Sequence, residues 1–332
     1  MSREMQTRPI GSSGIEASVV GLGTWAIGGW MWGGADENDA IATIHRALDL
    51  GINLVDTAPV YGFGQSEEIV GRALEGRRND VLIATKAGLD WSEGRPRRNS
   101  APERLRQELD DSLRRLRTDV IDIYQVHWPD EATAFEVTAE TLDAFRREGK
   151  IRAIGVSNFD IAQMDRFRKI APIATIQPPY NLFERGAEND VLPYAKTHGI
   201  VALTYGALCR GLLSGKIAAD TTFEGDDLRK FDPKFQPGRR EQYLDAVAKL
   251  DALAREKFGK SVLALAVRWI LDQGDTIALW GARRPAQLDP VPDISGWHID
   301  AATKKEIDRI LAETIADPVG PEFMAPPRTA TS

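Results

Sequence analysis

Four residues of this chain have side chains that together can move a hydride and a proton onto a carbonyl group. Asp56 and Tyr61 lie in the segment D-T-A-P-V-Y-G. Lys86 ends the segment I-A-T-K, and His127 ends Y-Q-V-H. Reduction of a carbonyl by hydride leaves an alkoxide that must be protonated, so the reaction needs a general acid beside the oxygen.

Tyr61 is the predicted proton donor. The ordinary pKa of a phenol is ~10, which is high for a donor at neutral pH, and a nearby ammonium lowers it. We predict that Lys86 supplies this ammonium and that Asp56 pairs with it and holds it in place. We also predict that His127 donates a hydrogen bond that orients the carbonyl.

Each of these residues, taken alone, has an ordinary structural explanation. A tyrosine in a glycine-rich loop usually packs, and an aspartate at a strand end usually forms a turn. A lysine there usually reaches water, and a histidine beside a tryptophan is usually just hydrogen-bonded in place. Burying four such groups together without partners would be costly. Their joint occurrence therefore favours a shared site.

The elements that would position these residues are short apolar segments. Runs that are mostly apolar, rather than alternating, are typical of strands buried on both faces of a parallel sheet. Eight such segments are separated by helix-like stretches: residues 19–22, 53–55, 81–84, 121–126, 153–156, 175–177, 200–203 and 276–279. Eight β-then-α units without a break in composition predict one closed (β/α)8 barrel over residues 1–332. All strands then end on one face, where the four side chains would converge.

The helical stretches contain residues that predict where helices begin and end and which face is buried. Ser100 begins the sequence S-A-P-E, which predicts a capping box at the start of a helix. The predicted apolar face of this helix consists of Leu105, Leu109, Leu113 and Leu116. Gly51 and Gly149 each follow an amphipathic stretch and are predicted left-handed caps. Residues 206–243, rich in glycine and proline, are predicted to form a functional loop over the barrel mouth.

A dinucleotide-binding alternative can be weighed at Gly21, where G-L-G-T-W-A fits the Rossmann fingerprint and Asp56 could bind a ribose. The segment W-M-W-G-G follows it, so a helix is not expected to begin at Thr24. The next helix is predicted to begin near Asp36 or Glu37. Without a helix N-terminus facing the glycines, a pyrophosphate would have no dipole to bind. We therefore do not assign a Rossmann fold.

Composition excludes several classes of protein. The net charge of −7 argues against nucleic acid or an anionic membrane surface as a partner. Cys209 is the only cysteine, and the four histidines lack the spacing of metal ligands. No stretch reaches the length of a membrane span, and residues 1–11 lack a signal-peptide core. We expect a cytoplasmic protein without a metal; the sequence leaves its oligomeric state open, with a monomer favoured.

Over nearly its whole length the chain resembles the aldo-keto reductase superfamily. The D-T-A-x-x-Y-G, T-K and H-W elements match the catalytic Asp, Tyr, Lys and His of that family residue by residue. The resemblance implies a TIM barrel with a short N-terminal β-hairpin and an extra C-terminal helix. It also implies NADPH as the coenzyme and a small-molecule aldehyde or alcohol as the substrate.

Further motifs imply how the nicotinamide end would bind. The sequence G-V-S-N-F at 155–159 is similar to the family motif whose Ser and Asn hydrogen-bond the nicotinamide carboxamide, here Ser157 and Asn158. Gln177 would share that role, and Tyr205 would stack on the ring. As an alternative, Ser157 and Asn158 could cap a following helix; both roles could hold at once.

The motifs implied for the pyrophosphate and adenosine end of the coenzyme differ more from the family pattern. The segment 203–216 resembles the family's pyrophosphate loop, but Gly206 and Ala207 replace the usual Ser and Pro, and Arg210 or Lys216 would compensate. The guanidinium of Arg283 would donate two hydrogen bonds to the adenosine 2′-phosphate. The alternative is that Arg283 and its neighbour are two solvated surface cations. Pro290 and Val291 stand where relatives often place Glu and Asn against adenine. The full set of implied contacts is Thr24, Trp25, Asp56, Ser157, Asn158, Gln177, Tyr205, Gly206, Leu208, Arg210, Lys216, Gly281, Arg283 and Gln287.

The expected substrate pocket is aromatic. Trp25, Trp91 and Trp128 are predicted to wall it together with Tyr61, with Trp30 and Trp32 nearby. Such a wall suits compact, partly apolar carbonyls. The stretch 281–287 and the ending 316–327, which belongs to the Pro-rich tail 317–332 apart from its first residue, look closest to a bacterial subgroup of general-stress reductases and glycerol or glyceraldehyde dehydrogenases. The tail is either frayed or a flap over the site.

We therefore expect reduction of small aldehydes, with glyceraldehyde among the candidates, and the reverse oxidation at high pH. Some relatives of this fold, the β subunits of potassium channels, hold NADPH and act chiefly as regulatory modules, and this is the main alternative. A metal-free barrel isomerase or lyase is a third possibility, and it would bind no nicotinamide.

Overall fold

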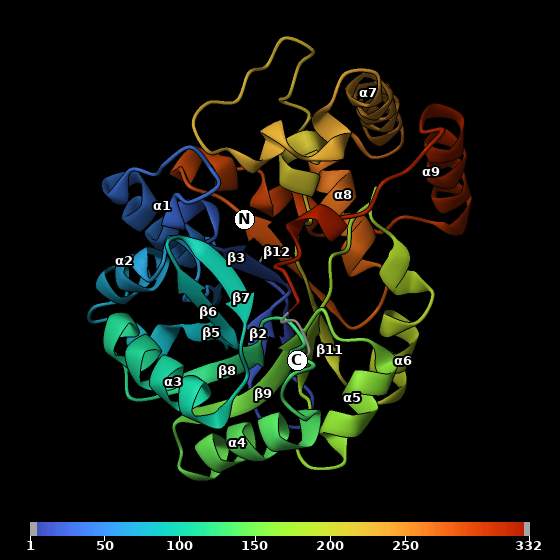
Figure 1. Ribbon diagram of the computed structural model, residues 1–332. Coiled ribbons are helices and arrows are strands. Elements are labelled where there is room, and N and C mark those ends of the chain that lie inside the picture. Colours follow the sequence, from blue (N-terminus) through green and yellow to red (C-terminus); the bar gives the residue numbers. More distant parts are fainter. Residues whose placement is uncertain (1–4, 329–332) are drawn as a thin grey trace.

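Eight parallel strands form a closed barrel in the computed structural model, which describes residues 5–328 (Figure 1). In barrel order the strands are β3 (Val20–Gly23), β4 (Leu54–Asp56), β5 (Leu82–Ala87), β8 (Ile121–Val126), β9 (Ile151–Ser157), β10 (Thr175–Gln177), β11 (Val201–Thr204) and β12 (Thr276–Gly281). The barrel closes where β12 pairs with β3, with Leu279 opposite Gly21. The predicted (β/α)8 fold is confirmed, and each predicted apolar segment overlaps one strand.

Strand residues divide between two apolar clusters, as expected for strands covered on both sides. In β4, for example, Leu54 belongs to the cluster that fills the barrel, whereas Val55 belongs to the larger cluster beneath the helices. Ile10 and Ile15 join the inner cluster from the N-terminal hairpin, formed by β1 (Thr7–Pro9) and β2 (Glu16–Ser18). The predicted hairpin is confirmed, and it plugs the amino end of the barrel.

The helices surround the strands (Figure 1). Those next to the barrel are α1 (Glu37–Asp49), α2 (Gln65–Ala73), α3 (Pro102–Leu116), α4 (Phe135–Arg147), α5 (Ile161–Arg168), α6 (Val191–Thr197) and α8 (Val262–Leu271). The predicted extra C-terminal helix is α9 (Ala301–Thr314), and it packs against a second added helix, α7 (Arg239–Phe258), which the sequence analysis did not predict. Between β12 and α9 the chain forms only short 3-10 turns, Pro285–Leu288 and Val291–Ile294, the first of which packs beside α1.

Most of the helix caps and helix faces predicted from the sequence are confirmed, but one cap is not. Gly51 and Gly149 have φ of 82° and 75°, which confirms the left-handed caps. The capping box at Ser100 is wrong, because Ala101 is the N-cap residue and no side chain caps α3. The backbone N–H of Ser100 donates instead to the carboxylate of Asp130, at 2.9 Å, which ties it to the loop after β8. The predicted apolar face of α3 is buried.

The helix start that argued against a Rossmann fold is confirmed. After β3 the chain makes only a short 3-10 turn, Ala26–Gly28. The following helix, α1, begins at Glu37 after the N-cap residue Asp36, whose side chain accepts from the N–H of Asp39. No helix N-terminus therefore faces the glycines of β3.

Three additions cover the carboxyl end of the barrel. They are the hairpin of β6 (Leu89–Ser92) and β7 (Arg95–Arg98), the loop after β11, and the tail that follows α9. The described part of the tail, 317–328, crosses the barrel mouth (Figure 1). It is held where Lys234 Nζ donates to the carbonyl of Gly320 at 3.2 Å and where the N–H of Val319 donates to Tyr243 Oη at 3.3 Å. This part is a flap rather than a frayed end; residues 329–332 lie outside the described range. Across residues 5–328, no helix has the length and apolar character that a membrane span requires.

Candidate active site

Asp56, Lys86 and Tyr61 meet at the carboxyl end of the barrel. Lys86 Nζ donates to Asp56 Oδ1 at 2.6 Å, to the carbonyl of Thr57 at 2.9 Å, and to Tyr61 Oη at 3.3 Å. Lys86 points into the barrel because side chains alternate along β5 and Ala84, two residues earlier, belongs to the cluster inside the barrel. The Lys86 side chain is fully buried. The ammonium therefore has three oxygen partners, which replace the water that burial removes.

His127 lies beside the ring of Tyr61. It follows β8, and its backbone N–H donates to the carbonyl of Ala87 at 2.8 Å. Its ring meets the Tyr61 ring edge to face, with 5.8 Å between centroids. Burial lowers the pKa of His127 well below its ordinary value, and the Lys86 charge lowers it further. The imidazole is therefore neutral near pH 7 and can donate one N–H.

The electrostatics of Tyr61 differ from the prediction. Burial raises the pKa of Tyr61, Lys86 lowers it, and Asp56 raises it again, so that the net pKa lies above the ordinary value. Lys86 lowers the pKa of Tyr61, as predicted, but desolvation of the phenolate and the charge of Asp56 together outweigh the ammonium. Burial lowers the pKa of Lys86, but Asp56 and Tyr61 raise it by more, so the amine stays charged.

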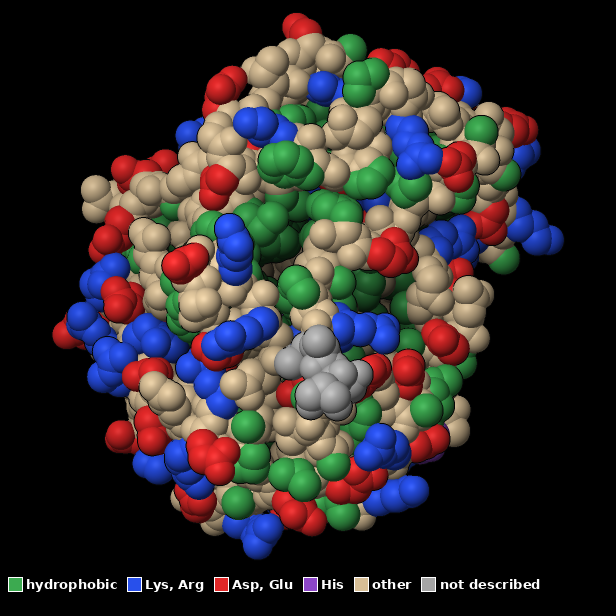
Figure 2. Space-filling model, in the orientation of Figure 1, with side chains coloured by type: hydrophobic (Ala, Val, Ile, Leu, Met, Phe, Trp, Pro, Cys, Tyr) green, Lys and Arg blue, Asp and Glu red, His purple; other side chains and the backbone are tan. Residues whose placement is uncertain are grey.

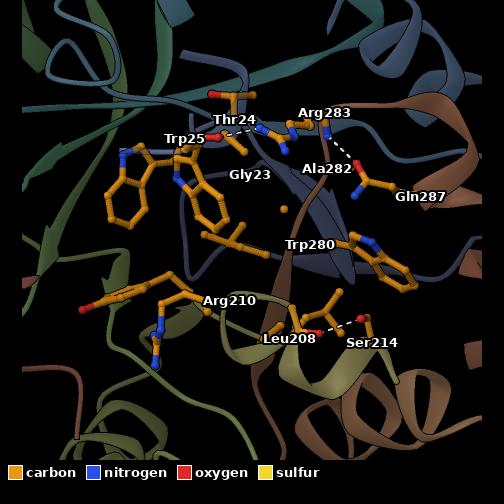
Figure 3. A pocket seen from close by; sticks show the side chains of 18 of the residues that line it. Gly23, Thr24, Trp25, Leu208, Arg210, Ser214, Trp280, Ala282, Arg283 and Gln287 are labelled. Carbon is orange, nitrogen blue, oxygen red and sulfur yellow. Dashed lines mark hydrogen bonds between the residues drawn. The ribbon is translucent and has the colours of Figure 1, made fainter. Parts of the chain in front are cut away.

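Two cavities open from this cluster, and Figure 2 shows apolar side chains gathered in a hollow of the same face. The first, of about 320 Å³, runs from Tyr61 past the loop after β11 to Arg283 and Gln287 (Figure 3). The second, of about 280 Å³, lies between His127 and the tail. The cavities share Trp25, Tyr61, Tyr205 and Met324. The phenol thus stands where a long cleft meets a compact pocket.

All of the predicted coenzyme-contact residues line one cavity or the other. The long cavity is lined by Thr24, Trp25, Asp56, Tyr205, Gly206, Leu208, Arg210, Lys216, Gly281, Arg283 and Gln287. The compact cavity is lined by Ser157, Asn158 and Gln177, again with Tyr205. Residues from opposite halves of the chain are therefore brought to one site.

Comparison with known proteins agrees with this geometry. Residues 19–312 match the profile of the aldo/keto reductase family. The chain belongs to the aldo/keto reductase family. Members of this family are NAD(P)-dependent oxidoreductases, and the chain is therefore an enzyme of that kind.

Several relatives of this aldo/keto reductase have names that state an activity or a subgroup. It is 59% identical over 326 residues to aldo-keto reductase YhdN of Bacillus subtilis (strain 168), which covers 97% of this chain and 98% of that protein. It is 38% identical over 301 residues to the NADH-specific methylglyoxal reductase of Escherichia coli (strain K12), covering 86% and 91%. The structure of the glycerol dehydrogenase AKR11B4 from Gluconobacter oxydans superposes with a TM-score of 0.87 at 56% identity, covering 98% and 99%. The predicted resemblance to this bacterial subgroup is confirmed.

The residues predicted for the nicotinamide end of this reductase are linked by hydrogen bonds. Asn158 has a left-handed backbone, with φ of 60°, and its Nδ2 donates to the carbonyl of His127 at 3.0 Å. Its Oδ1 accepts from Tyr205 Oη at 2.9 Å. Ser157 Oγ donates to the carbonyl of Gln177 at 2.8 Å. Neither Ser157 nor Asn158 caps α5, because Asp160 is its N-cap.

The charge of the Arg210 guanidinium is not available to a pyrophosphate. Its guanidinium is buried in ion pairs with Glu184 and Asp232, and Lys234 Nζ joins Glu184 at 2.8 Å. In Figure 3 the side chain points away from the cavity. Of the two residues predicted to compensate for the lost hydroxyl, Arg210 has its charge held by two buried carboxylates, which leaves Lys216. Lys216 lines the cavity and is exposed.

Arg283 lines the long cavity next to Gln287 (Figure 3). Its Nη1 donates to the carbonyls of Trp32 and Gly34, at 2.6 and 3.1 Å, and its backbone N–H donates to Gln287 Oε1 at 2.9 Å. Burial lowers the pKa of Arg283, and nearby Arg229 lowers it further. The charge of Arg229 is itself paired with Asp227, whose carboxylate raises the pKa of Arg283. Pro290 and Val291 do not line the cavity.

The aromatic wall differs from the prediction at two positions, Trp30 and Trp91. Trp25 and Trp128 line the compact cavity, and so does Trp30, which was expected only nearby. Trp91 does not line it. The ring of Phe63 stands between them, 4.9 Å from Trp30 and 5.7 Å from Trp91, so Trp91 forms a second row behind the wall.

Gln125 was not among the predicted site residues. Its Nε2 donates to Asp56 Oδ2 at 3.3 Å, and Gln177 Nε2 donates to the same oxygen at 2.8 Å. Side chains alternate along a strand, and Ile123 of β8 belongs to the cluster inside the barrel. Gln125, two residues later, must point inward as well. That alternation was the available signal.

Proposed function

We propose that this aldo/keto reductase reduces small aldehydes to alcohols with NADPH, with glyceraldehyde among the candidates, and catalyses the reverse oxidation. The observation that carries the proposal is the 3.3 Å separation of Tyr61 Oη from Lys86 Nζ, at the junction of a long cleft and a compact aromatic pocket. Similar proteins named glycerol dehydrogenase and methylglyoxal reductase support a small oxygenated substrate.

The long cavity has the features that a dinucleotide needs. Its walls carry Lys216 and Arg283, which suit phosphates in a chain of net charge −7, whereas the guanidinium of Arg229 is paired with Asp227. At Gly281 no atom lies within 4 Å of the position a Cβ would take, so a ligand can approach the backbone there. Its other end reaches Tyr61 and Tyr205. When bound, the nicotinamide coenzyme supplies the hydride.

The side chains of this reductase would handle the proton. His127, as a neutral imidazole, donates a hydrogen bond to the carbonyl oxygen. Tyr61 gives its proton to that oxygen as negative charge develops there, which leaves a phenolate beside Lys86. The phenolate regains a proton from solvent, so one proton is consumed for each aldehyde reduced. In oxidation the phenolate accepts the proton of the alcohol instead.

This scheme predicts opposite pH dependences for the two directions. Because burial raises the pKa of Tyr61, its phenol holds the proton at neutral pH. The kcat of reduction should therefore be flat near pH 7 and fall only on the alkaline side. The kcat of oxidation should rise with pH, because it needs the phenolate. Steady-state rates in both directions would test this, and parallel profiles would contradict it.

Arg283 would select NADPH over NADH. Arg283→Ala should raise the KM for NADPH roughly ten- to hundredfold, as expected for losing a hydrogen bond between two charged groups, and should leave the KM for NADH nearly unchanged. The matched control is Arg284→Ala, because the side chain of Arg284 is 69% exposed and pairs with Asp39. Equal effects on both coenzymes would count against phosphate binding by Arg283. Because one relative is named as NADH-specific, this measurement decides which of the two coenzymes the present chain prefers.

The proposed reaction is tested by mixing the protein and NADPH with a panel of small aldehydes and following nicotinamide absorbance. Many turnovers per active site are expected. A single stoichiometric oxidation would instead favour an NADPH-binding regulatory module. Failure to bind nicotinamide at all would point to a different reaction, such as an isomerisation.

A further inference from the structure

A layer of buried polar side chains lies inside the barrel beside Asp56. Gln125 of β8 and Gln177 of β10 are buried, and both amide nitrogens donate to Asp56 Oδ2. The other carboxylate oxygen, Oδ1, accepts from Lys86 at 2.6 Å. The two oxygens of one carboxylate are therefore given different partners.

The hydrogen bonds to the side-chain oxygen of Gln125 set the orientation of its amide group. Its Oε1 accepts from Gln177 Nε2 at 3.4 Å and from Thr175 Oγ1 at 3.5 Å. Both of these partners lie on β10, on the side away from Lys86 in the barrel order. With its oxygen facing these donors, the amide must turn its nitrogen toward Asp56.

Gly155 of β9 provides the space for this arrangement. A Cβ at this position would lie 2.2 Å from Thr175 Oγ1 and 2.7 Å from the Gln125 side chain. Both distances are far below van der Waals contact, and Gly155 does not have a left-handed backbone that would otherwise call for glycine. The strand between β8 and β10 thus has no side chain where the glutamine crosses.

We propose that Gln125 is a positioning residue of the reaction, which holds Asp56 through Oδ2 so that Oδ1 stays aimed at the Lys86 ammonium. This role rests on the proposed function. Without the Gln125 amide, the carboxylate keeps one donor on Oδ2 and can rotate, and the ammonium can shift from Tyr61. The effect should fall on kcat, because Gln125 does not line either cavity.

Two variants of Gln125 separate positioning from packing. Gln125→Leu fills a similar volume without a donor and should lower kcat about tenfold at every pH, the order expected for losing a hydrogen bond to a charged group. Gln125→Glu places a carboxyl group that can donate to Asp56 only while it is protonated. Its kcat should approach that of the wild type at low pH and fall as the new group ionises. The titratable groups facing that carboxyl are Asp56 and Lys86, with Tyr61 and His127 beyond them.

The matched control lies on the same strand. Tyr124 is buried next to Gln125 but faces outward toward Phe145 of α4, and its hydroxyl has no hydrogen-bond partner among the described residues. Tyr124→Phe removes a buried polar atom from β8 and should leave kcat and its pH profile unchanged. A fall in this variant as large as in Gln125→Leu would show a general effect of disturbing the strand and overturn the positioning role.

The outcomes also separate this role from the proposed function. If the wild type shows no turnover with any aldehyde, the proposed function fails and the role of Gln125 fails with it. If the wild type turns over and Gln125→Leu matches it, only the positioning role is overturned. If Gln125→Leu does not fold, the pH profile of Gln125→Glu decides: a new transition supports the role, and a profile parallel to the wild type overturns it.

Discussion

Tyr61→Phe should lower kcat by about 10²-fold or more, the usual range for loss of a general acid. The substitution removes only the hydroxyl that lies 3.3 Å from Lys86 Nζ. The ring keeps its stacking with Trp25, at 5.9 Å and an interplanar angle of 20°, so both cavities should keep their shape. The Kd of NADPH, measured by fluorescence, should therefore stay close to that of the wild type.

A tyrosine outside the site provides the control. Tyr194 of α6 donates to Asp165 on the outer surface and lines neither of the two cavities. Tyr194→Phe should leave kcat unchanged. If Tyr61→Phe also turned over at the wild-type rate, Tyr61 would be removed from the mechanism, and the proton would have to come from another group such as His127.

Lys86→Met should affect both activity and stability. The side chains of Lys86 and Asp56 are 0% and 3% exposed, so the variant leaves a carboxylate buried without its cation. Breaking a buried pair in this way costs about 3–5 kcal/mol, and the free energy of unfolding in urea should fall by that amount. The kcat should fall by about 10²-fold or more, because the phenolate left by proton transfer loses its stabilising charge.

A double variant distinguishes the two effects. Asp56→Asn combined with Lys86→Met removes both charges, so no buried ion remains unpaired, and most of the unfolding free energy should return. Turnover should stay low, because the ammonium is still missing. Recovery of turnover together with stability would show that Lys86 acts only in folding and would contradict the proposed chemistry.

Much of this protein could be predicted from the order of its residues. The eight apolar segments predict a barrel because a strand covered on both faces must be apolar throughout, which is a local property of the sequence. Asp56, Lys86 and His127 each end or follow such a segment. Since parallel strands of a barrel end on one face, their convergence follows from the topology without any detail of packing.

Other features depended on contacts between distant parts of the chain. The spacing of residues around Arg210 gives no sign that Glu184 and Asp232 hold its charge, because these residues approach only when two loops fold over the barrel. Trp91 is kept from the pocket by the ring of Phe63, and the tail lies over the mouth because Lys234 and Tyr243 bind it.

The direction of the Gln125 side chain follows from the sequence, whereas its partners follow from the tertiary structure. Alternation along β8 determines that it points into the barrel, but not which group it contacts there. That depends on Asp56 and Gln177 from other strands and on the space left by Gly155. A periodic pattern determines the direction of a side chain, because backbone geometry repeats locally. Its partners depend on distances across the fold, which only the tertiary structure sets.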